Sequence, residues 1–123
     1  MPQHTMVWTA NRDDPPVSSN DTLLFTSDGL VLSSIAGQDW VVKSTLSASS
    51  ASMLDSGNFV TYNAHQEIVW QSFRHTTDTL LPGQYKFVEE ELFSPKSETD
   101  HSTGIFCLKM QDDGNLFSQN AYY

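Results

Sequence analysis

Cysteine and basic residues are scarce in this sequence. Of its 123 residues, 1 is Cys, 6 are Lys or Arg and 15 are Asp or Glu, which gives a formal net charge of -9. This charge opposes binding to phosphate backbones and anionic lipid surfaces, so we expect neither a nucleic acid partner nor direct membrane contact. The single cysteine, Cys107, cannot form an internal disulfide, and we expect it to be a small buried apolar side chain.

Long apolar runs and catalytic motifs are also missing. No apolar run approaches the ~20 residues that a membrane span needs, and the first residues, MPQHTMVW, lack the pattern of a signal peptide. The sequence contains no Gly-x-Ser-x-Gly elbow, P-loop or kinase signature. The histidines His4, His65, His75 and His101 are scattered, without a carboxylate at ligand spacing. We therefore expect a non-catalytic chain without cofactor or metal.

Three copies of one short pattern are present instead. They read TSDGLVLSS at 26–34, LDSGNFVTYN at 54–63 and QDDGNLFSQN at 111–120. In each copy an Asp-Gly or Ser-Gly pair is followed by alternating apolar residues, which is typical of a β-hairpin. We expect each pair to form a tight two-residue turn with positive backbone angles.

A second repeated word contains tryptophan. VWTANR (7–12) matches VWQSFR (69–74), and DWVVKS around Trp40 is a looser third version. Trp8, Trp40 and Trp70 thus recur about every 30 residues, which predicts an all-β array whose tryptophans are buried near a common centre. No long segment has a helical period, and EEELF at 89–93 is too short to count. Strands are expected at 22–26, 30–33, 39–42, 51–54, 58–62, 68–72, 105–110 and 115–118.

The run MLDSG at 53–57 also resembles the catalytic loop of a dimeric aspartic protease, with Asp55 as the catalyst. The repeat argues against this alternative, because Asp55-Ser56-Gly57 occupies the place of two other turn-forming sequences. The apolar-apolar-Gly segment that supports such a loop is also missing, since LLPG at 80–83 contains a proline. We therefore interpret Asp55 as a turn residue.

The segments VWTANRDDPPVS, MLDSGNFVTYN and VWQSFRHTTDTLLPGQ resemble the bulb-type, mannose-binding lectin domain. They are most similar to its version in plant G-type lectin S-receptor-like serine/threonine kinases. The resemblance implies a β-prism II fold with pseudo-threefold repeats and a carbohydrate-recognition function on the extracellular face of the plasma membrane, or in a secreted protein. Any kinase would belong to the parent protein and not to this chain.

The same resemblance implies where sugar would bind. Family members carry Gln-x-Asp-x-Asn-x-Val-x-Tyr once per unit, and short amides and carboxylates suit the hydroxyl groups of a mannose-type ring. In the third copy Gln111, Asp113 and Asn115 match, while Phe117 replaces the valine and Gln119 replaces the tyrosine. We expect this copy to hold the site, with millimolar affinity or none.

The other two copies match less well. A weaker second site is expected in the middle copy, which keeps Asn58, Val60 and Tyr62 but has Leu54 and Ser56 in place of Gln and Asp. The first copy keeps only Asp28. The alternative function is a protein-interaction module of the same fold that has lost sugar binding, so the ligand is either a mannose-type glycan or a protein.

Two further expectations concern the chain as a whole. Asn20-Asp21-Thr22 is a formal N-glycosylation sequon, which matters if the parent protein is secreted. By the family resemblance, residues 1–123 form an incomplete lectin domain, whose first unit begins before Met1 and whose last unit is cut at Tyr123. Open sheet edges would then allow association with another copy of the chain.

Overall fold

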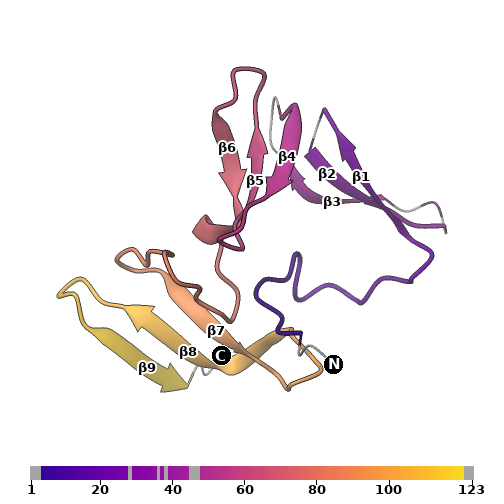
Figure 1. Cartoon of the computed structure of the whole chain (residues 1–123). Coiled ribbons are helices and arrows are strands. Elements are labelled where there is room, and N and C mark those ends of the chain that lie inside the picture. The colour runs from indigo at the N-terminus through magenta and orange to yellow at the C-terminus, as the bar shows by residue number, and fades with distance from the viewer. Residues whose placement is uncertain (1–3, 28, 36, 38, 45–47, 121–123) are drawn as a thin grey trace. The chain divides into compact units, whose positions relative to one another are not determined.

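The structure is a computed structural model that describes residues 4–27, 29–35, 37, 39–44 and 48–120, with residues 40–44 described by their backbone. Within these residues the chain forms nine β-strands, one 3₁₀ helix and no α-helix. The strands make three antiparallel sheets of three strands each, ordered β1-β2-β3, β4-β5-β6 and β7-β8-β9 (Figure 1). The all-β prediction is confirmed.

The first two sheets belong to one compact unit, Pro15–Ser72. The first sheet contains β1 (Thr22–Thr26), β2 (Gly29–Ser33) and β3 (Asp39–Ser44), and the second contains β4 (Ser50–Met53), β5 (Phe59–Tyr62) and β6 (Ile68–Gln71). The central strand β5 holds the best-buried side chains, with Val60 at 0% exposure and Thr61 at 2%.

Trp70 on β6 completes this small core. It is 7% exposed, and its ring meets Phe59 edge-on, with ring centroids 6.3 Å apart. Such an arrangement is favourable for two aromatic quadrupoles.

The third sheet belongs to a second compact unit, made of Met1–Asp14 and Phe73–Tyr123. It contains β7 (Glu91–Pro95), β8 (Thr103–Met110) and β9 (Leu116–Asn120), and the 3₁₀ helix η1 (Ser72–Arg74) lies at the start of this part of the chain. Cys107 on the central strand β8 is 3% exposed, so its prediction as a buried side chain is confirmed. Burial, with some repulsion from Glu91, raises the pKa of its thiol.

Within this second unit, side chains of the N-terminal segment bind to residues of the C-terminal part. The Arg12 guanidinium donates to the carbonyl oxygens of Phe93, Ser94, His101 and Ser102 at 2.9 to 3.4 Å, and it lies 3.9 Å from the Asp78 carboxylate. Asp13 accepts hydrogen bonds from the backbone and hydroxyl of Thr103, at 2.8 and 2.7 Å. Residues about 90 positions apart in the sequence are thereby held together.

Strand β7 was not expected from the sequence. Its first residues belong to an acidic run that favours solvent over a sheet, but β7 pairs with β8 along Glu91–Phe93, and the Phe93 N–H donates to the Thr77 carbonyl. Tertiary pairing therefore overrides the weak local strand preference. His101 has a carboxylate partner that is distant in the sequence, since its Nδ1 lies 2.9 Å from Asp78 Oδ2.

The predicted two-residue turns are wrong in the second and third copies. In the second copy the Gly57 N–H donates to the Leu54 carbonyl and the Leu54 N–H donates to Asn58, which makes a three-residue loop. Gly57 has a φ of 87°, whereas Ser56 is not among the residues of positive φ. This is a type I turn followed by a glycine bulge, in which one left-handed residue is sufficient.

The tryptophan prediction is confirmed only for Trp70. Trp8 lies in the other unit, is half-buried, and donates its indole N–H to the His75 carbonyl at 2.8 Å. The side chain of Trp40 and the whole of Asp28 lie outside the described residues. A common centre for the three tryptophans stays a prediction.

Candidate functional site

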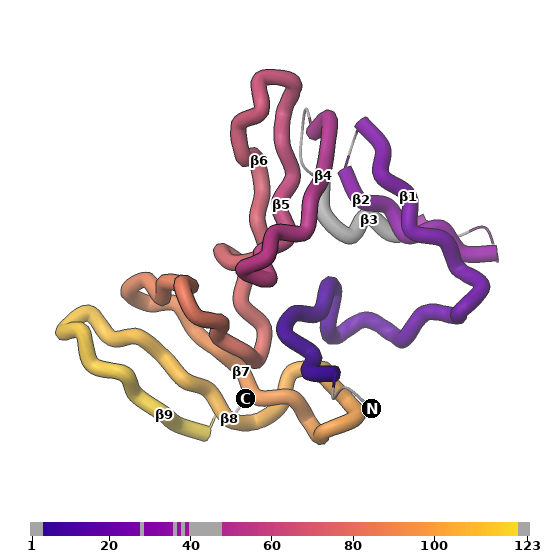
Figure 2. The backbone as a smooth tube through the Cα atoms, in the orientation of Figure 1, coloured from indigo at the N-terminus to yellow at the C-terminus, as the bar shows by residue number. Residues whose placement is uncertain are grey.

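The third repeat copy, residues 111–120, contains the loop between β8 and β9 and strand β9 itself (Figure 2, in yellow). The Gln111 N–H donates to the Asn115 carbonyl at 2.9 Å, and the Gly114 N–H donates to the Gln111 carbonyl at 3.0 Å. Gly114 has a φ of 84°. The loop therefore has the same hydrogen-bond pattern as the loop at 54–58, and glycine supplies the left-handed residue that the bulge requires.

Two motif side chains are joined inside this loop. Asp113 Oδ1 accepts from the Asn115 backbone N–H at 2.9 Å, and Asp113 Oδ2 accepts from Asn115 Nδ2 at 2.8 Å. The backbone bond and then the side-chain bond from Asn115 hold the pKa of Asp113 below its usual range. Asp113 is thus a carboxylate at neutral pH, and Asn115 is fixed with its amide beside that carboxylate.

The remaining motif residues follow along one face of the sheet. In the β8–β9 ladder Phe117 lies opposite Lys109, and Gln119 lies opposite Cys107. Alternate residues of a strand share a face, as do residues paired directly across a ladder. Gln111, Asn115, Phe117 and Gln119 are therefore on the same face of the third sheet.

This face is accessible next to the hairpin. Asn115 and Gln119 are exposed, Gln111 is half-buried, and Phe117 is 45% exposed. The arrangement presents amide donors and acceptors, a carboxylate and an apolar ring to the solvent. These are the groups that recognise a polyhydroxylated ring with an apolar side.

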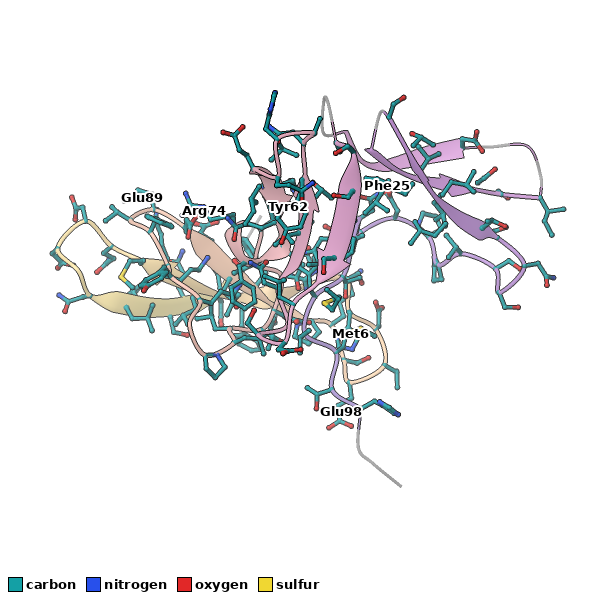
Figure 3. All side chains as sticks on the ribbon, turned by 45° about the horizontal axis from the view of Figure 1, so that its top comes forward. Met6, Phe25, Tyr62, Arg74, Glu89 and Glu98 are labelled. Carbon is teal, nitrogen blue, oxygen red and sulfur yellow. The ribbon has the colours of Figure 1, made fainter. Side chains whose placement is uncertain are left out.

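The middle copy places its motif residues differently. Val60 has no exposed surface, and Asn58 is 7% exposed. Asn58 Nδ2 donates to Gln71 Oε1 at 2.9 Å, and Asn58 Oδ1 accepts from the Ser72 hydroxyl at 3.5 Å. Tyr62, labelled on β5 in Figure 3, is half-buried. The Asn58 amide and the Val60 side chain are thus engaged in the core of their unit, whereas Asn115 and Phe117 face solvent.

Two other sequence candidates are found in turns. Asp55 is exposed, in the loop that joins β4 to β5, as the turn interpretation expects. Asn20 is exposed in a turn before β1, where its N–H donates to the Ser18 hydroxyl at 3.2 Å.

The structure also shows polar groups that sequence reasoning missed. Lys109 pairs with Glu89 beside Phe117, and Asp78 joins Arg12 to His101. Lys109 could have been found, since it lies two residues before Gln111 on a predicted strand. No local sequence pattern indicates the cluster of Arg12, Asp78 and His101, because Asp78 lies 66 residues from Arg12 and 23 residues from His101.

In the described part of the chain, no group of three or more His, Cys, Asp or Glu side chains could hold a metal ion. None of the helices described there is long and apolar enough to cross a membrane.

Comparison with known proteins places these features in a family. The family model for D-mannose binding lectin matches residues 5–99, so the hairpin at 111–119 lies beyond the matched segment. The relatives include two receptor-like kinases that are each 38% identical to this chain. G-type lectin S-receptor-like serine/threonine-protein kinase RLK1 of Arabidopsis thaliana matches over 121 residues, and LECRK1 of Oryza sativa subsp. japonica over 122. Receptor-like serine/threonine-protein kinase SD1-7 of Arabidopsis thaliana is 35% identical over 127 residues.

These matches cover about nine-tenths of this chain but a small part of each relative. They span 91% of this chain and 14% of RLK1, 91% and 15% for LECRK1, and 90% and 14% for SD1-7. Each of these relatives therefore extends far beyond the region that matches this chain. Because the family model covers most of the sequence and the third hairpin continues the repeated pattern of the second, the chain belongs to the D-mannose binding lectin family.

Proposed function

We propose that this chain is a non-catalytic carbohydrate-recognition domain for mannose-type glycans, within the ectodomain of a plant receptor-like kinase. The observation that carries the proposal is the β8–β9 hairpin. It holds Asp113 and Asn115 together at the surface, with Gln111 and Phe117 on the same face. The β-prism II architecture with pseudo-threefold repeats is part of the same proposal.

The roles of the side chains follow from their chemistry. The Asp113 carboxylate accepts hydrogen bonds from sugar hydroxyls, and the amides of Gln111 and Asn115 both donate and accept. Because Asp113 already fixes Asn115, less conformational entropy is lost when a sugar binds. Phe117 would meet the apolar side of the ring.

Two substitutions weaken this site relative to the family motif. Phe117 is bulkier than the family valine and hinders close approach of the ring, and Gln119 lacks a phenol at the sugar's edge. Each lost hydrogen bond costs about 0.5 to 1.5 kcal/mol, which is roughly a two- to tenfold weakening. We expect the chain to bind methyl α-mannoside with millimolar affinity or more weakly.

NMR titration of the ¹⁵N-labelled chain with methyl α-mannoside tests this function. The double variant Phe117→Val, Gln119→Tyr should bind more tightly than the wild type, with shifts centred on the Asn115 amide. Adding Asn115→Ala to that variant should abolish binding. Shifts centred on Asn58 and Tyr62, or binding that survives Asn115→Ala, would place the sugar elsewhere and refute the assignment.

The alternative is a protein-interaction module of the same fold without sugar affinity. The two departures at Phe117 and Gln119 favour it, since they remove the valine and the phenol of the family motif. The double variant separates the two functions, because a domain that retains the sugar-binding frame gains affinity when those side chains are restored. Its failure to bind any mannoside would favour the protein ligand.

An extracellular location follows from the proposed ectodomain role. The exposed Asn20 sequon is the expected attachment position for an N-linked glycan in such a setting. The kinase activity belongs to the proposed parent protein.

A further inference from the structure

The sheet face that carries Phe117 continues into a pair of opposite charges. Lys109 on β8 lies directly opposite Phe117 on β9 and opposite Glu91 on β7. Residues paired across a ladder project to the same face, so the Lys109 side chain stands on the face of Gln111 and Asn115. It is 29% exposed.

Glu89 is the partner of Lys109. Its Oε2 forms an ion pair with Lys109 Nζ, and 63% of its side chain is exposed. The Glu89 N–H donates to the Met110 carbonyl at 2.8 Å, which fixes this residue next to β8 even though it precedes β7 (Figure 3). The hydrogen bond and the charge of Glu89 raise the pKa of Lys109, so the ammonium keeps its charge at neutral pH.

We propose that the Lys109–Glu89 pair forms a subsite for the second residue of a neutral oligosaccharide, next to the Asn115 hairpin. This inference rests on the proposed function and extends it from a single sugar to a longer glycan. Lys109 on β8 lies two residues before Gln111, a step of about 6.6 to 6.8 Å in an extended chain, which is comparable to the length of one pyranose ring.

The chemistry of the pair fits neighbouring hydroxyl groups. The ammonium donates hydrogen bonds and the carboxylate accepts them, so the pair can meet one hydroxyl as acceptor and the next as donor. Glu89 and Glu91 place two carboxylates beside one ammonium, and the neighbouring loop adds the Asp113 carboxylate, so the net negative charge opposes binding of an acidic sugar. A neutral hexose is therefore the favoured second residue.

The middle hairpin has no equivalent of this subsite. Counting back from the turn, the position of Lys109 corresponds to Ser52, which lies opposite the fully buried Val60. Two of the described hairpins, β4–β5 and β8–β9, have this loop pattern and carry motif residues. Of these two, only β8–β9 has a charged pair beside its motif residues. The subsite is thus specific to the copy that keeps Gln, Asp and Asn.

Paired NMR titrations test the inference. Methyl α-mannoside and an α-linked mannobiose would be titrated into the Phe117→Val, Gln119→Tyr variant, alone and with Lys109→Met added. Lys96→Met is the matched control, because it removes the same charge from an exposed residue outside this face. The mannobiose should bind about two- to tenfold more tightly than the methyl mannoside, which corresponds to one hydrogen bond or slightly more.

The subsite predicts that Lys109→Met removes this advantage and leaves the methyl mannoside affinity unchanged, while Lys96→Met changes neither. If the methyl mannoside binds at Asn115 but mannobiose shows no advantage, or one that survives Lys109→Met, the subsite is refuted and the proposed function stands. If neither sugar binds, the proposed function is refuted together with the subsite. Circular dichroism of each variant confirms that the sheet remains folded.

Discussion

Replacing Arg12 with alanine should destabilise the chain far more than the same change at Arg74. The two arginines end the matching words VWTANR and VWQSFR, so they form a matched pair in sequence. Arg12 is 11% exposed in its side chain and donates to four backbone carbonyls. Arg74 is exposed and lies with its guanidinium carbon 4.0 Å from the centroid of the Phe87 ring.

The expected magnitudes follow from these contacts. Breaking a buried ion pair by removing one partner costs about 3 to 5 kcal/mol. Asp78, 4% exposed in its side chain, keeps its hydrogen bonds with His101 and Thr79, so we expect the lower end, about 3 kcal/mol, for Arg12→Ala. An exposed cation–π contact contributes about 0.5 to 1 kcal/mol, which sets the expected cost of Arg74→Ala.

Urea unfolding followed by tryptophan fluorescence measures both costs. With a slope of about 1 to 3 kcal/mol/M, the midpoint for Arg12→Ala should lie about 1 M or more below that of the wild type. Arg74→Ala should shift it only slightly. Equal midpoints for the two variants would refute the conclusion that Arg12 fastens the N-terminal segment to the third sheet.

Three further predictions concern single residues. Burial would raise the pKa of Asp78, but its hydrogen bonds to His101 and Thr79 and the charge of Arg12 outweigh burial, so the pKa in the folded chain is lowered. The Asp78 carboxylate therefore stabilises the fold at pH values above the pKa of an aspartate in the unfolded chain. This stabilisation is lost as the pH falls through the lower pKa of the folded chain. Urea unfolding at pH 5 and pH 2.5 should show a smaller loss of stability for Asp78→Asn than for wild type, and an equal loss would contradict this. Gly104→Ala should cost about 1 to 3 kcal/mol, because its Cβ would lie 2.6 Å from the Pro95 carbonyl oxygen and 2.7 Å from that of Ser94 on β7; an unchanged melting temperature would contradict it. When secreted from plant cells, the chain should carry a glycan whose mass disappears with Asn20→Gln, and an unchanged mass would exclude that position.

The strands could be predicted from the sequence where side chains alternate. Predicted strand 22–26 coincides with β1, and the other predicted strands overlap β2 to β6, β8 and β9. The prediction succeeded because the alternation of apolar and polar residues reports directly on a half-buried sheet. It failed at β7, because Glu91 and its acidic neighbours enter the sheet only through pairing with β8.

The hairpin loops contained a signal that was misread. The predicted strands 51–54 and 58–62 leave three residues between them, which is the loop that the structure has, yet the Ser-Gly pair was interpreted as a two-residue turn. The Arg12–Asp78–His101 cluster could not be predicted, because it depends on how distant segments meet. The face shared by Gln111, Asn115 and Phe117 could be predicted, since it follows from strand alternation alone.

The central claim is that the Asn115 hairpin recognises mannose-type glycans. A glycan array probed with the Phe117→Val, Gln119→Tyr variant tests it most directly, with the same variant carrying Asn115→Ala as the control. We predict retention on mannose-terminated glycans that disappears with Asn115→Ala. Retention on no mannose-terminated glycan, or retention that Asn115→Ala leaves unchanged, would contradict the claim.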